Sequence, residues 1–269
     1  MIPKHELDII YSFFAGYTKA DRLMGRDFPP LDEVTKGKIE EAIKRLKEGE
    51  PVQYVLGEWD FYKNRFIVGE GCLIPRQDTE ILVERAIEIL PKGGRFADLC
   101  TGSGCIAISI LGDRKDASAV AADISEKALA YARKNSLSCG VDQRLEIKKL
   151  DVLSEKIKGE YPLIVSNPPY IRSCDIDGLD DRVKKEPRIA LDGGEDGLDF
   201  YRGILEVQAG ALSEGGRFLF EIGYDQKEDI EKLAEEKGYT AQFIKDYQGN
   251  YRVAELMRIG DLQSSVTDR

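Results

Sequence analysis

The sequence contains a single histidine, His5, among its 269 residues. A mechanism that needs a histidine base is therefore poorly supported, because His5 lies in a segment expected to form a surface helix. The five cysteines form no C-x-x-C pair and have no histidine nearby, which argues against a metal site or a disulfide framework and fits a reducing cytoplasm. No apolar run reaches the length of about 18 residues that a membrane helix needs. A cytoplasmic protein without a membrane segment is expected.

An excess of positive charge is also absent. The formal net charge is −10, which disfavours long contacts with nucleic acid because those contacts neutralise phosphates. A protein or small-molecule partner is favoured instead, although a locally basic patch is still compatible with this charge. With 42% hydrophobic and 33% charged residues, the composition is that of a globular protein of one large domain or two.

Apolar residues recur at helical spacing in two early stretches, from Leu7 to Phe14 and from Ile39 to Leu46. Residues 1–50 are therefore expected to form a small helical domain, which carries no visible site chemistry and would dock the substrate. Residues 51–77 are predicted to be a β-hairpin linker in which 52–56 already form a strand. Asp78 or Thr79 is expected to cap the helix that follows.

Strands and helices alternate in residues 78–262. This pattern predicts an α/β domain with a doubly wound, mainly parallel, Rossmann-like sheet and an antiparallel edge, whereas 263–269 are expected to form a tail. The seven predicted strands are 95–99, 118–122, 144–149, 163–166, 217–222, 240–244 and 253–258.

A glycine-rich stretch, Asp-Leu-Cys-Thr-Gly-Ser-Gly, occupies residues 98–104 between the first of these strands and a helix. Its glycines allow the backbone to approach a ligand, and the helix start offers free N–H groups. Asp123 follows Gly104 by 19 residues and can accept both hydroxyls of a ribose. The spacing of Gly102, Gly104 and Ala107 also satisfies the dinucleotide pattern, so an NAD-dependent oxidoreductase is one alternative.

Two aspartates favour S-adenosylmethionine over NAD. Asp98 is placed to meet a positively charged amino group, where it would repel a pyrophosphate. Asp151 follows the third strand in Leu150-Asp151-Val152 and could accept a hydrogen bond from an adenine amino group, or be an ordinary loop or capping aspartate. These aspartates fall at the carboxyl ends of strands, where open α/β sheets bind ligands.

The sequence Asn167-Pro168-Pro169-Tyr170 follows the fourth strand. Two prolines in succession cannot donate backbone hydrogen bonds and fix φ near −65°, so the strand must end at Ser166. The Asn167 side chain and neighbouring carbonyls would form a rigid group of acceptors suited to a planar –NH2 group. The alternative is a proline-rich strand exit that only turns the chain.

With both motifs in place, the chain resembles class I S-adenosylmethionine-dependent methyltransferases that act on planar nitrogens. The stretches at 74–80, 186–191 and 194–198 resemble the protein-(glutamine-N5) methyltransferases of peptide-chain release factors, and this similarity spans nearly the whole chain. It implies methyl transfer from S-adenosylmethionine, leaving S-adenosylhomocysteine, to the glutamine of the Gly-Gly-Gln motif.

The resemblance also implies roles for individual residues. It assigns the substrate glutamine to Asn167, Pro168, Pro169 and Tyr170. Cofactor binding is assigned to Cys100, Thr101, Gly102, Ser103, Gly104, Asp123, Val152 and Asn167. Two positions depart from the family pattern: Cys100 stands where a glycine is usual, so a positive φ is not expected there, and Val152 replaces a position that is often aromatic.

In the expected mechanism the Asn167 side-chain oxygen and the Pro168 carbonyl accept both hydrogens of the amide, and Tyr170 packs against it. A methyltransferase acting on base amines of nucleic acids would also suit these motifs, as would a nucleotide-binding protein without catalysis. We expect a monomer without direct nucleic-acid contact. Four charged residues have no assigned role and would ordinarily form surface ion pairs: Arg76, Glu186, Glu221 and Arg252.

Overall fold

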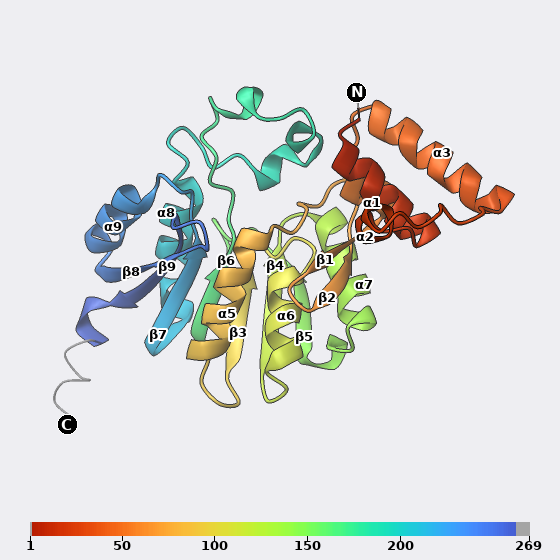
Figure 1. Cartoon of the computed structure of the whole chain (residues 1–269). Helices are drawn as coiled ribbons and strands as arrows, with labels where there is room; N and C mark the ends of the chain where they lie inside the picture. Colours follow the sequence, from red (N-terminus) through yellow and green to blue (C-terminus); the bar gives the residue numbers. More distant parts are fainter. Residues whose placement is uncertain (1, 262–269) are drawn as a thin grey trace.

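A seven-stranded sheet forms the centre of the molecule in this computed structural model, which describes residues 2–261 (Figure 1). The strand order is β5-β4-β3-β6-β7-β9-β8; within residues 2–261, β9 pairs antiparallel with β7 and with β8, and the other strand pairs of this sheet are parallel. The predicted sheet with an antiparallel edge is thereby confirmed, whereas the predicted tail lies outside the described residues. The strands are β3 (Arg95–Leu99), β4 (Ser118–Asp123), β5 (Leu145–Lys149), β6 (Tyr161–Ser166), β7 (Leu212–Glu221), β8 (Tyr239–Lys245) and β9 (Tyr251–Arg258).

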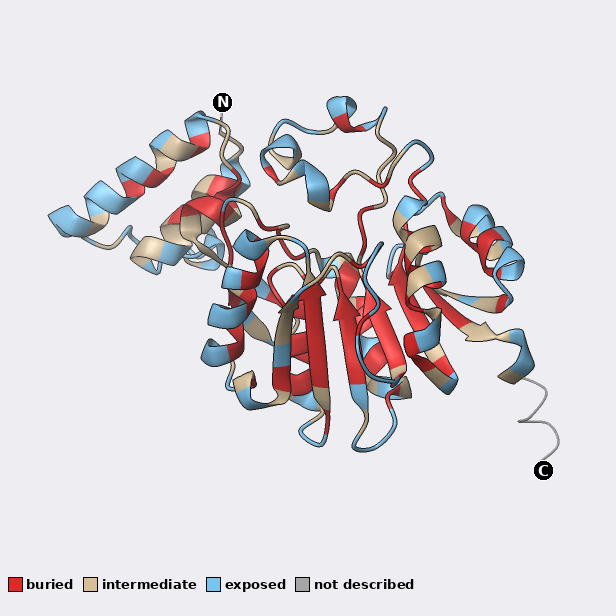
Figure 2. Cartoon of the chain, turned by 180° about the vertical axis from the view of Figure 1, so that it is seen from behind, coloured by how far each residue is buried: buried red, intermediate tan, exposed pale blue. Residues whose placement is uncertain are grey.

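Helices cover both faces of the sheet and bury its strands (Figure 2). Successive residues of β3 enter different cores: Phe96 packs in the cluster that contains α5 and α6, and Ala97 packs in the one that contains α8 and α9. Buried parallel strands require such apolar side chains on both faces. The helices are α5 (Glu80–Ile89), α6 (Cys105–Asp113), α7 (Glu126–Ser138), α8 (Asp199–Val207) and α9 (Lys227–Glu236).

Four helices form the N-terminal region, and three of them, α1, α3 and α4, share a separate small core of Ile10, Ile39, Ala42, Leu46, Val52 and Val55. They are α1 (Lys4–Ala15), α2 (Lys19–Leu23), α3 (Glu33–Lys47) and α4 (Val52–Leu56). The hairpin of β1 (Glu58–Phe61) and β2 (Asn64–Ile67) then leads to the sheet. A hairpin linker was predicted and is confirmed, but the helical region continues to Leu56.

The predicted strand at 52–56 is wrong, because this segment is helix α4. Pro51 stands at its N-terminal boundary, where the missing N–H is not needed. Gly57 ends the helix with φ 78° and donates its N–H to the Gln53 carbonyl at 2.9 Å. Burial of Val52 and Val55 against the first helices outweighs their preference for strands.

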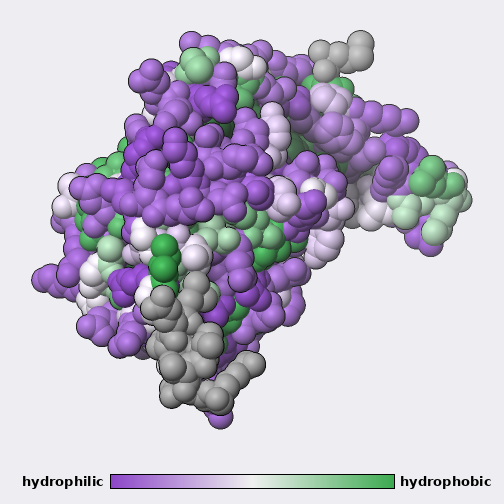
Figure 3. Space-filling view, turned by 90° about the vertical axis from the view of Figure 1, so that its left-hand side faces the viewer, coloured by the Kyte–Doolittle hydropathy of each residue, from purple (hydrophilic) through white to green (hydrophobic). Residues whose placement is uncertain are grey.

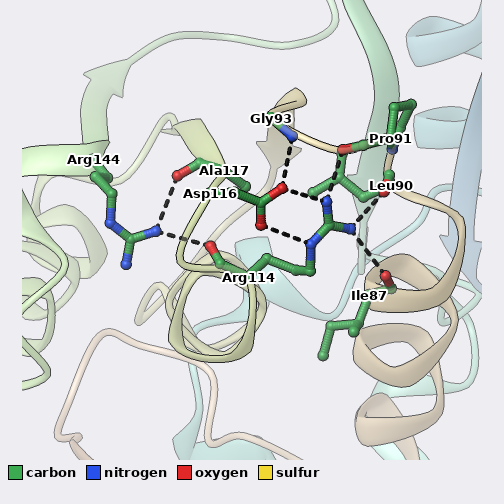
Figure 4. A network of polar contacts seen from close by, with 8 residues as sticks. All are labelled: Ile87, Leu90, Pro91, Gly93, Arg114, Asp116, Ala117 and Arg144. Carbon is green, nitrogen blue, oxygen red and sulfur yellow. Dashed lines mark hydrogen bonds and ion pairs between the residues drawn. The ribbon is translucent and has the colours of Figure 1, made fainter.

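Arg114 holds together the loops that precede β3 and β4, at the amino ends of these two strands (Figure 4). Its guanidinium donates to the carbonyls of Ile87, Leu90 and Pro91 and pairs with Asp116. Asp116 accepts from the Gly93 N–H at 2.6 Å, and Arg144 donates to the carbonyls of Arg114 and Ala117. This network provides hydrogen-bond donors for the carbonyl groups of these loops. It stabilises the end of the sheet opposite to the site described below.

The surface on the α9 and β8 side is largely hydrophilic (Figure 3). Among residues 2–261, no helix has both the length and the apolar character needed to cross a membrane.

Candidate active site

A cavity of about 290 Å³ opens at the carboxyl ends of β3, β4, β5 and β6. This is the edge at which open α/β sheets bind ligands. Most of the residues singled out in the sequence line it: Cys100, Thr101, Gly102, Ser103, Asp123, Asp151, Val152, Asn167 and Pro169. Further lining comes from Thr79, from residues 71–76 and from Pro187, Ile189 and Ala190.

Two glycines of the loop serve different purposes. Gly102 has φ 57°, and a Cβ there would meet no atom within 4 Å, so the space in front of it is open. Gly104 has φ 81°, and a Cβ there would lie only 2.9 Å from Ile108 Cδ1 and 3.2 Å from Ala132 Cβ. Gly102 therefore leaves room for a ligand beside the loop, whereas Gly104 lets the loop turn tightly into α6.

Cys100 departs from the expectation, since its φ is +57°. A non-glycine residue in the left-handed region costs about 1–2 kcal/mol, so the surroundings must hold it there. Flanking contacts do so: the Thr101 N–H donates to the Ala122 carbonyl at 3.0 Å, and Ser166 Oγ donates to the Leu99 carbonyl at 2.7 Å. Burial raises the pKa of the Cys100 thiol well above its usual value, so the group stays neutral.

The Asp123 carboxylate links the glycine loop to the start of α7. Its Oδ2 accepts from the Gly102 N–H at 2.9 Å, and its Oδ1 accepts from the Ser125 N–H at 2.8 Å. Burial raises its pKa, against the opposing effect of these two bonds. Each oxygen retains a lone pair, so the carboxylate could also accept two neighbouring hydroxyls from a ligand in the cavity.

Asp98 lies behind the loop and does not line the cavity. Its Oδ2 accepts from Thr101 Oγ1 at 2.5 Å and from the Ala107 N–H at 3.2 Å, while Oδ1 has no hydrogen-bond partner among the described residues. Asp98 therefore holds the loop and the first turn of α6 in place. Its predicted direct contact with a ligand amino group stays a prediction.

Asp151 has the ordinary turn contacts that the sequence allowed as an alternative. Its Oδ1 accepts from the Leu153 N–H at 3.0 Å and its Oδ2 from Ser154 Oγ at 2.8 Å. The residue nevertheless lines the cavity, as does the buried Val152, whose carbonyl accepts from Gln208 Nε2 at 2.8 Å. Asp151 and Val152, which follow β5, could therefore both contact a ligand in the cavity.

Only part of the Asn-Pro-Pro-Tyr motif lines the cavity. Asn167 and Pro169 line the cavity, and Asn167 Nδ2 donates to Thr79 Oγ1 at 3.3 Å. Pro168 and Tyr170 do not line it. The Tyr170 ring packs on the core, and its hydroxyl donates to Glu221 Oε1 at 3.3 Å. The predicted packing of Tyr170 against a substrate amide therefore stays a prediction.

Surface ion pairing is the wrong interpretation for Glu186 and Glu221, which are only 4% and 1% exposed. Glu186 accepts from the Ile74 N–H at 2.9 Å and pairs with Arg76. Arg252 has only 12% of its side chain exposed and pairs with Asp78 at 3.1 Å. The apolar residues that precede Glu221 in β7 already indicate burial in the sequence.

Thr79 was also missed as a site residue. It was expected to cap α5, but neither it nor Asp78 does so: the helix start carries no side-chain cap, and Asp78 pairs with Arg252 instead. The Thr79 hydroxyl oxygen instead accepts a hydrogen bond from Asn167 Nδ2 at 3.3 Å. A threonine before a helix is so common as a cap that its sequence context gave no sign of this second use.

Two buried carboxyls predict how stability depends on pH. Burial raises the pKa of Asp98 from its usual 3.8 to about 7 and that of Glu221 from 4.5 to about 7. The folded protein thus keeps protons that the unfolded chain has lost above pH 5. The free energy of unfolding should therefore fall as pH rises from about 4 to about 7, by several kcal/mol in all, and then level off.

Denaturant unfolding between pH 5 and 8 measures this slope. The double variant Asp98→Asn with Glu221→Gln should have a flatter profile, because neither amide titrates. An unchanged slope in that variant would show that other groups cause the dependence.

Comparison with known proteins identifies two matching families. Residues 2–57 match the PrmC N-terminal domain, and residues 77–182 match the Methyltransferase small domain. The structure of a methyltransferase from Pyrococcus furiosus is 17% identical, covers 84% of this chain and 98% of that one, and has a TM-score of 0.52. That likeness shows the methyltransferase fold.

Curated relatives are closer in sequence. The release factor glutamine methyltransferase of Moorella thermoacetica is 37% identical over 93% of this chain and 89% of its own length. That of Clostridium botulinum is 40% identical over 87% of this chain and 86% of its own. Similarity of this extent covers the helical domain, the hairpin and the sheet together. The chain belongs to the release factor glutamine methyltransferase family.

Proposed function

We propose that this protein transfers a methyl group from S-adenosylmethionine to the side-chain amide nitrogen of the glutamine in the Gly-Gly-Gln motif of peptide-chain release factors. One observation carries the proposal: Asn167, at the exit of β6, lines the same cavity as Gly102 and Asp123. An amide-binding group and a nucleoside-binding loop thus share one space. Family membership supplies the identity of the two ligands.

The chain's own residues fit the proposed cofactor. Asp123 would accept the ribose hydroxyls, the open space at Gly102 would admit the ligand backbone, and Asp151 with Val152 would border the adenine. The bound cofactor supplies a sulfonium methyl, an electrophile strong enough that positioning can dominate the catalysis. No histidine is then needed.

Asn167 would activate the substrate. An amide nitrogen is a poor nucleophile because its lone pair is delocalised into the carbonyl. Since Nδ2 of Asn167 donates to Thr79, its Oδ1 is free to accept one substrate N–H. The Pro168 carbonyl is the second acceptor that the sequence predicts, although Pro168 is not among the residues that line the cavity. The nitrogen then presents its lone pair to the methyl group. The bound cofactor would supply the methyl group, and the amide nitrogen that receives it would release one proton to water.

The helical domain would dock the release factor. Glu6 in α1 is buried and pairs with Arg182, which belongs to the segment that follows the Asn-Pro-Pro-Tyr motif and runs above the carboxyl ends of the strands (Figure 1). This ion pair connects the helical domain to the segment that follows the Asn-Pro-Pro-Tyr motif. A monomer would suffice, because one chain provides all the proposed site residues.

Exposed apolar residues of this domain allow a test of docking. Leu23 and Met24, at the end of α2, are 75% and 69% exposed. Changing both to serine should raise KM for the intact release factor about 5-fold to 30-fold, the effect of losing 1–2 kcal/mol of apolar contact. Methylation of a short Gly-Gly-Gln peptide should not change, since the peptide cannot reach α2.

Leu137→Ser is the matched control, because Leu137 is 66% exposed but lies on α7. It should leave KM for the intact factor unchanged. If the wild-type protein, the Leu23→Ser/Met24→Ser variant and Leu137→Ser all had the same KM for the intact factor, docking through the end of α2 would be refuted.

The runner-up acceptor, a base amine in nucleic acid, is disfavoured by the net charge of −10. Incubation with tritiated S-adenosylmethionine and separate acceptors tests the choice. Label in the release factor and none in DNA or RNA is the expected result, and label in nucleic acid alone would overturn the proposal.

A further inference from the structure

We propose that Gln226 is a positioning residue that fixes the backbone of the Asn-Pro-Pro-Tyr motif for methyl transfer. Gln226 immediately precedes α9, and it is only 2% exposed. It does not line the cavity, so it would act through the motif without touching the substrate. This inference rests on the proposed function, because it concerns how precisely the motif meets the substrate amide.

The Gln226 side chain joins three loops. Its Nε2 donates to the Tyr170 carbonyl at 3.0 Å and to the Gly197 carbonyl at 3.2 Å, while its Oε1 accepts from the Gly223 N–H at 2.9 Å. Tyr170 follows β6, Gly197 precedes α8 and Gly223 follows β7. Only the –NH2 end of an amide can serve two carbonyls, so these three bonds fix the orientation of the side chain.

Two glycines let their own segment pack directly on the end of the motif. A Cβ on Gly197 would lie 2.5 Å from the Tyr170 carbonyl oxygen and 2.8 Å from Gln226 Nε2. A Cβ on Gly193 would lie 2.7 Å from Tyr170 Cα, and the Gly193 N–H donates to the Ile171 carbonyl at 2.8 Å. The backbone at Tyr170 is therefore enclosed between this segment and Gln226.

These contacts mean that the motif is held at both of its ends. At its start, Ser166 belongs to β6 and its Oγ donates to the Leu99 carbonyl at 2.7 Å. At its end, the Tyr170 carbonyl is bound by Gln226. The two prolines between these points have a restricted φ, so the ends together determine where Asn167 lies. Since a displacement of about 1 Å can lower a rate about 100-fold, Gln226 would control how well Asn167 Oδ1 meets the substrate nitrogen.

Replacing Gln226 by leucine tests the arrangement, because leucine is apolar and removes all three bonds. We expect kcat for methylation of the release factor to fall about 10-fold to 100-fold, as for a displaced reacting group. KM for the release factor and the Kd of S-adenosylmethionine should each change by less than about 2-fold, since the docking surface and the glycine loop are untouched. Steady-state kinetics with calorimetry of cofactor binding separates these quantities.

Gln208→Leu is the matched comparison. Gln208 is fully buried and makes the same three kinds of bond: its Nε2 donates to the carbonyls of Val152 at 2.8 Å and Glu155 at 2.9 Å, and its Oε1 accepts from the Ile157 N–H at 2.9 Å. These bonds lie on the proposed cofactor side. The variant should therefore raise the Kd of S-adenosylmethionine and leave kcat at saturating cofactor within about 2-fold of wild type. An equal fall of kcat in both glutamine variants would show a general loss of packing and contradict the inference.

Gly197→Ala provides a second test that does not depend on the folding of Gln226→Leu. Its Cβ would push against the Tyr170 carbonyl and Gln226 Nε2, so kcat should fall to a similar extent. Gly238→Ala is its control, because φ is 81° at Gly238 and 78° at Gly197, but a Cβ on Gly238 would meet no atom within 4 Å. The two variants thus share the backbone strain and differ in the contact with the motif.

The outcomes of these tests are distinct. A wild-type kcat in Gly197→Ala or in folded Gln226→Leu would overturn the inference, as would an equal loss of kcat in Gly238→Ala. If the wild-type enzyme left the Gly-Gly-Gln glutamine unmethylated, the proposed function itself would fail.

Discussion

Alanine at position 167 should lower the rate of methyl transfer by about 10²–10³-fold, far more than it weakens binding of S-adenosylmethionine. The estimate follows from oxyanion-hole donors, since one preorganised hydrogen-bonding group in a transition state has about this value. Asn167 lines the cavity, and its contact with Thr79 uses Nδ2 and leaves Oδ1 available. The change to alanine therefore removes the oxygen that would accept a hydrogen bond from the substrate nitrogen. Single-turnover transfer to a release factor, with calorimetry of cofactor binding, measures the two effects separately.

Aspartate in place of Asn167 supplies the comparison for this result. Asn167→Asp keeps an oxygen acceptor and should retain more activity than Asn167→Ala. A wild-type rate for the alanine variant, or equal rates for the two variants, would contradict the role of Asn167.

Asp123→Ala should weaken binding of S-adenosylmethionine by about 10-fold to 150-fold for each ribose bond lost, at about 1.5–3 kcal/mol per charge-assisted hydrogen bond. The change also removes the acceptors of the Gly102 and Ser125 N–H groups, so the glycine loop loses its tie to α7. Asp123→Asn retains one oxygen and should bind more tightly than the alanine variant. Calorimetry that finds unchanged affinity in folded Asp123→Ala would disprove the assignment.

The sheet could be predicted because its strands carry their own signals. Apolar runs such as the one from Tyr161 to Val165 are required for burial on both faces, and prolines and glycines mark their ends. The candidate site followed from the same feature, since residues at the carboxyl ends of neighbouring parallel strands must lie close together.

Residues whose conformation depends on distant contacts could not be predicted. Val52–Leu56 has the local preference of a strand, but the first helices bury it as α4. Cys100 takes a positive φ because hydrogen bonds of its two neighbours, Thr101 with Ala122 and Leu99 with Ser166, hold the backbone there. Thr79 and Asn167 lie 88 positions apart in the sequence, so only the fold reveals that their side chains meet.

The central claim concerns where the methyl group goes. Single-turnover transfer from labelled S-adenosylmethionine to a release factor, followed by mass mapping of its peptides, answers this directly. The account predicts one methyl group on the side-chain nitrogen of the Gly-Gly-Gln glutamine, with none after that glutamine is changed to alanine. A methyl group on any other residue of the factor would contradict it.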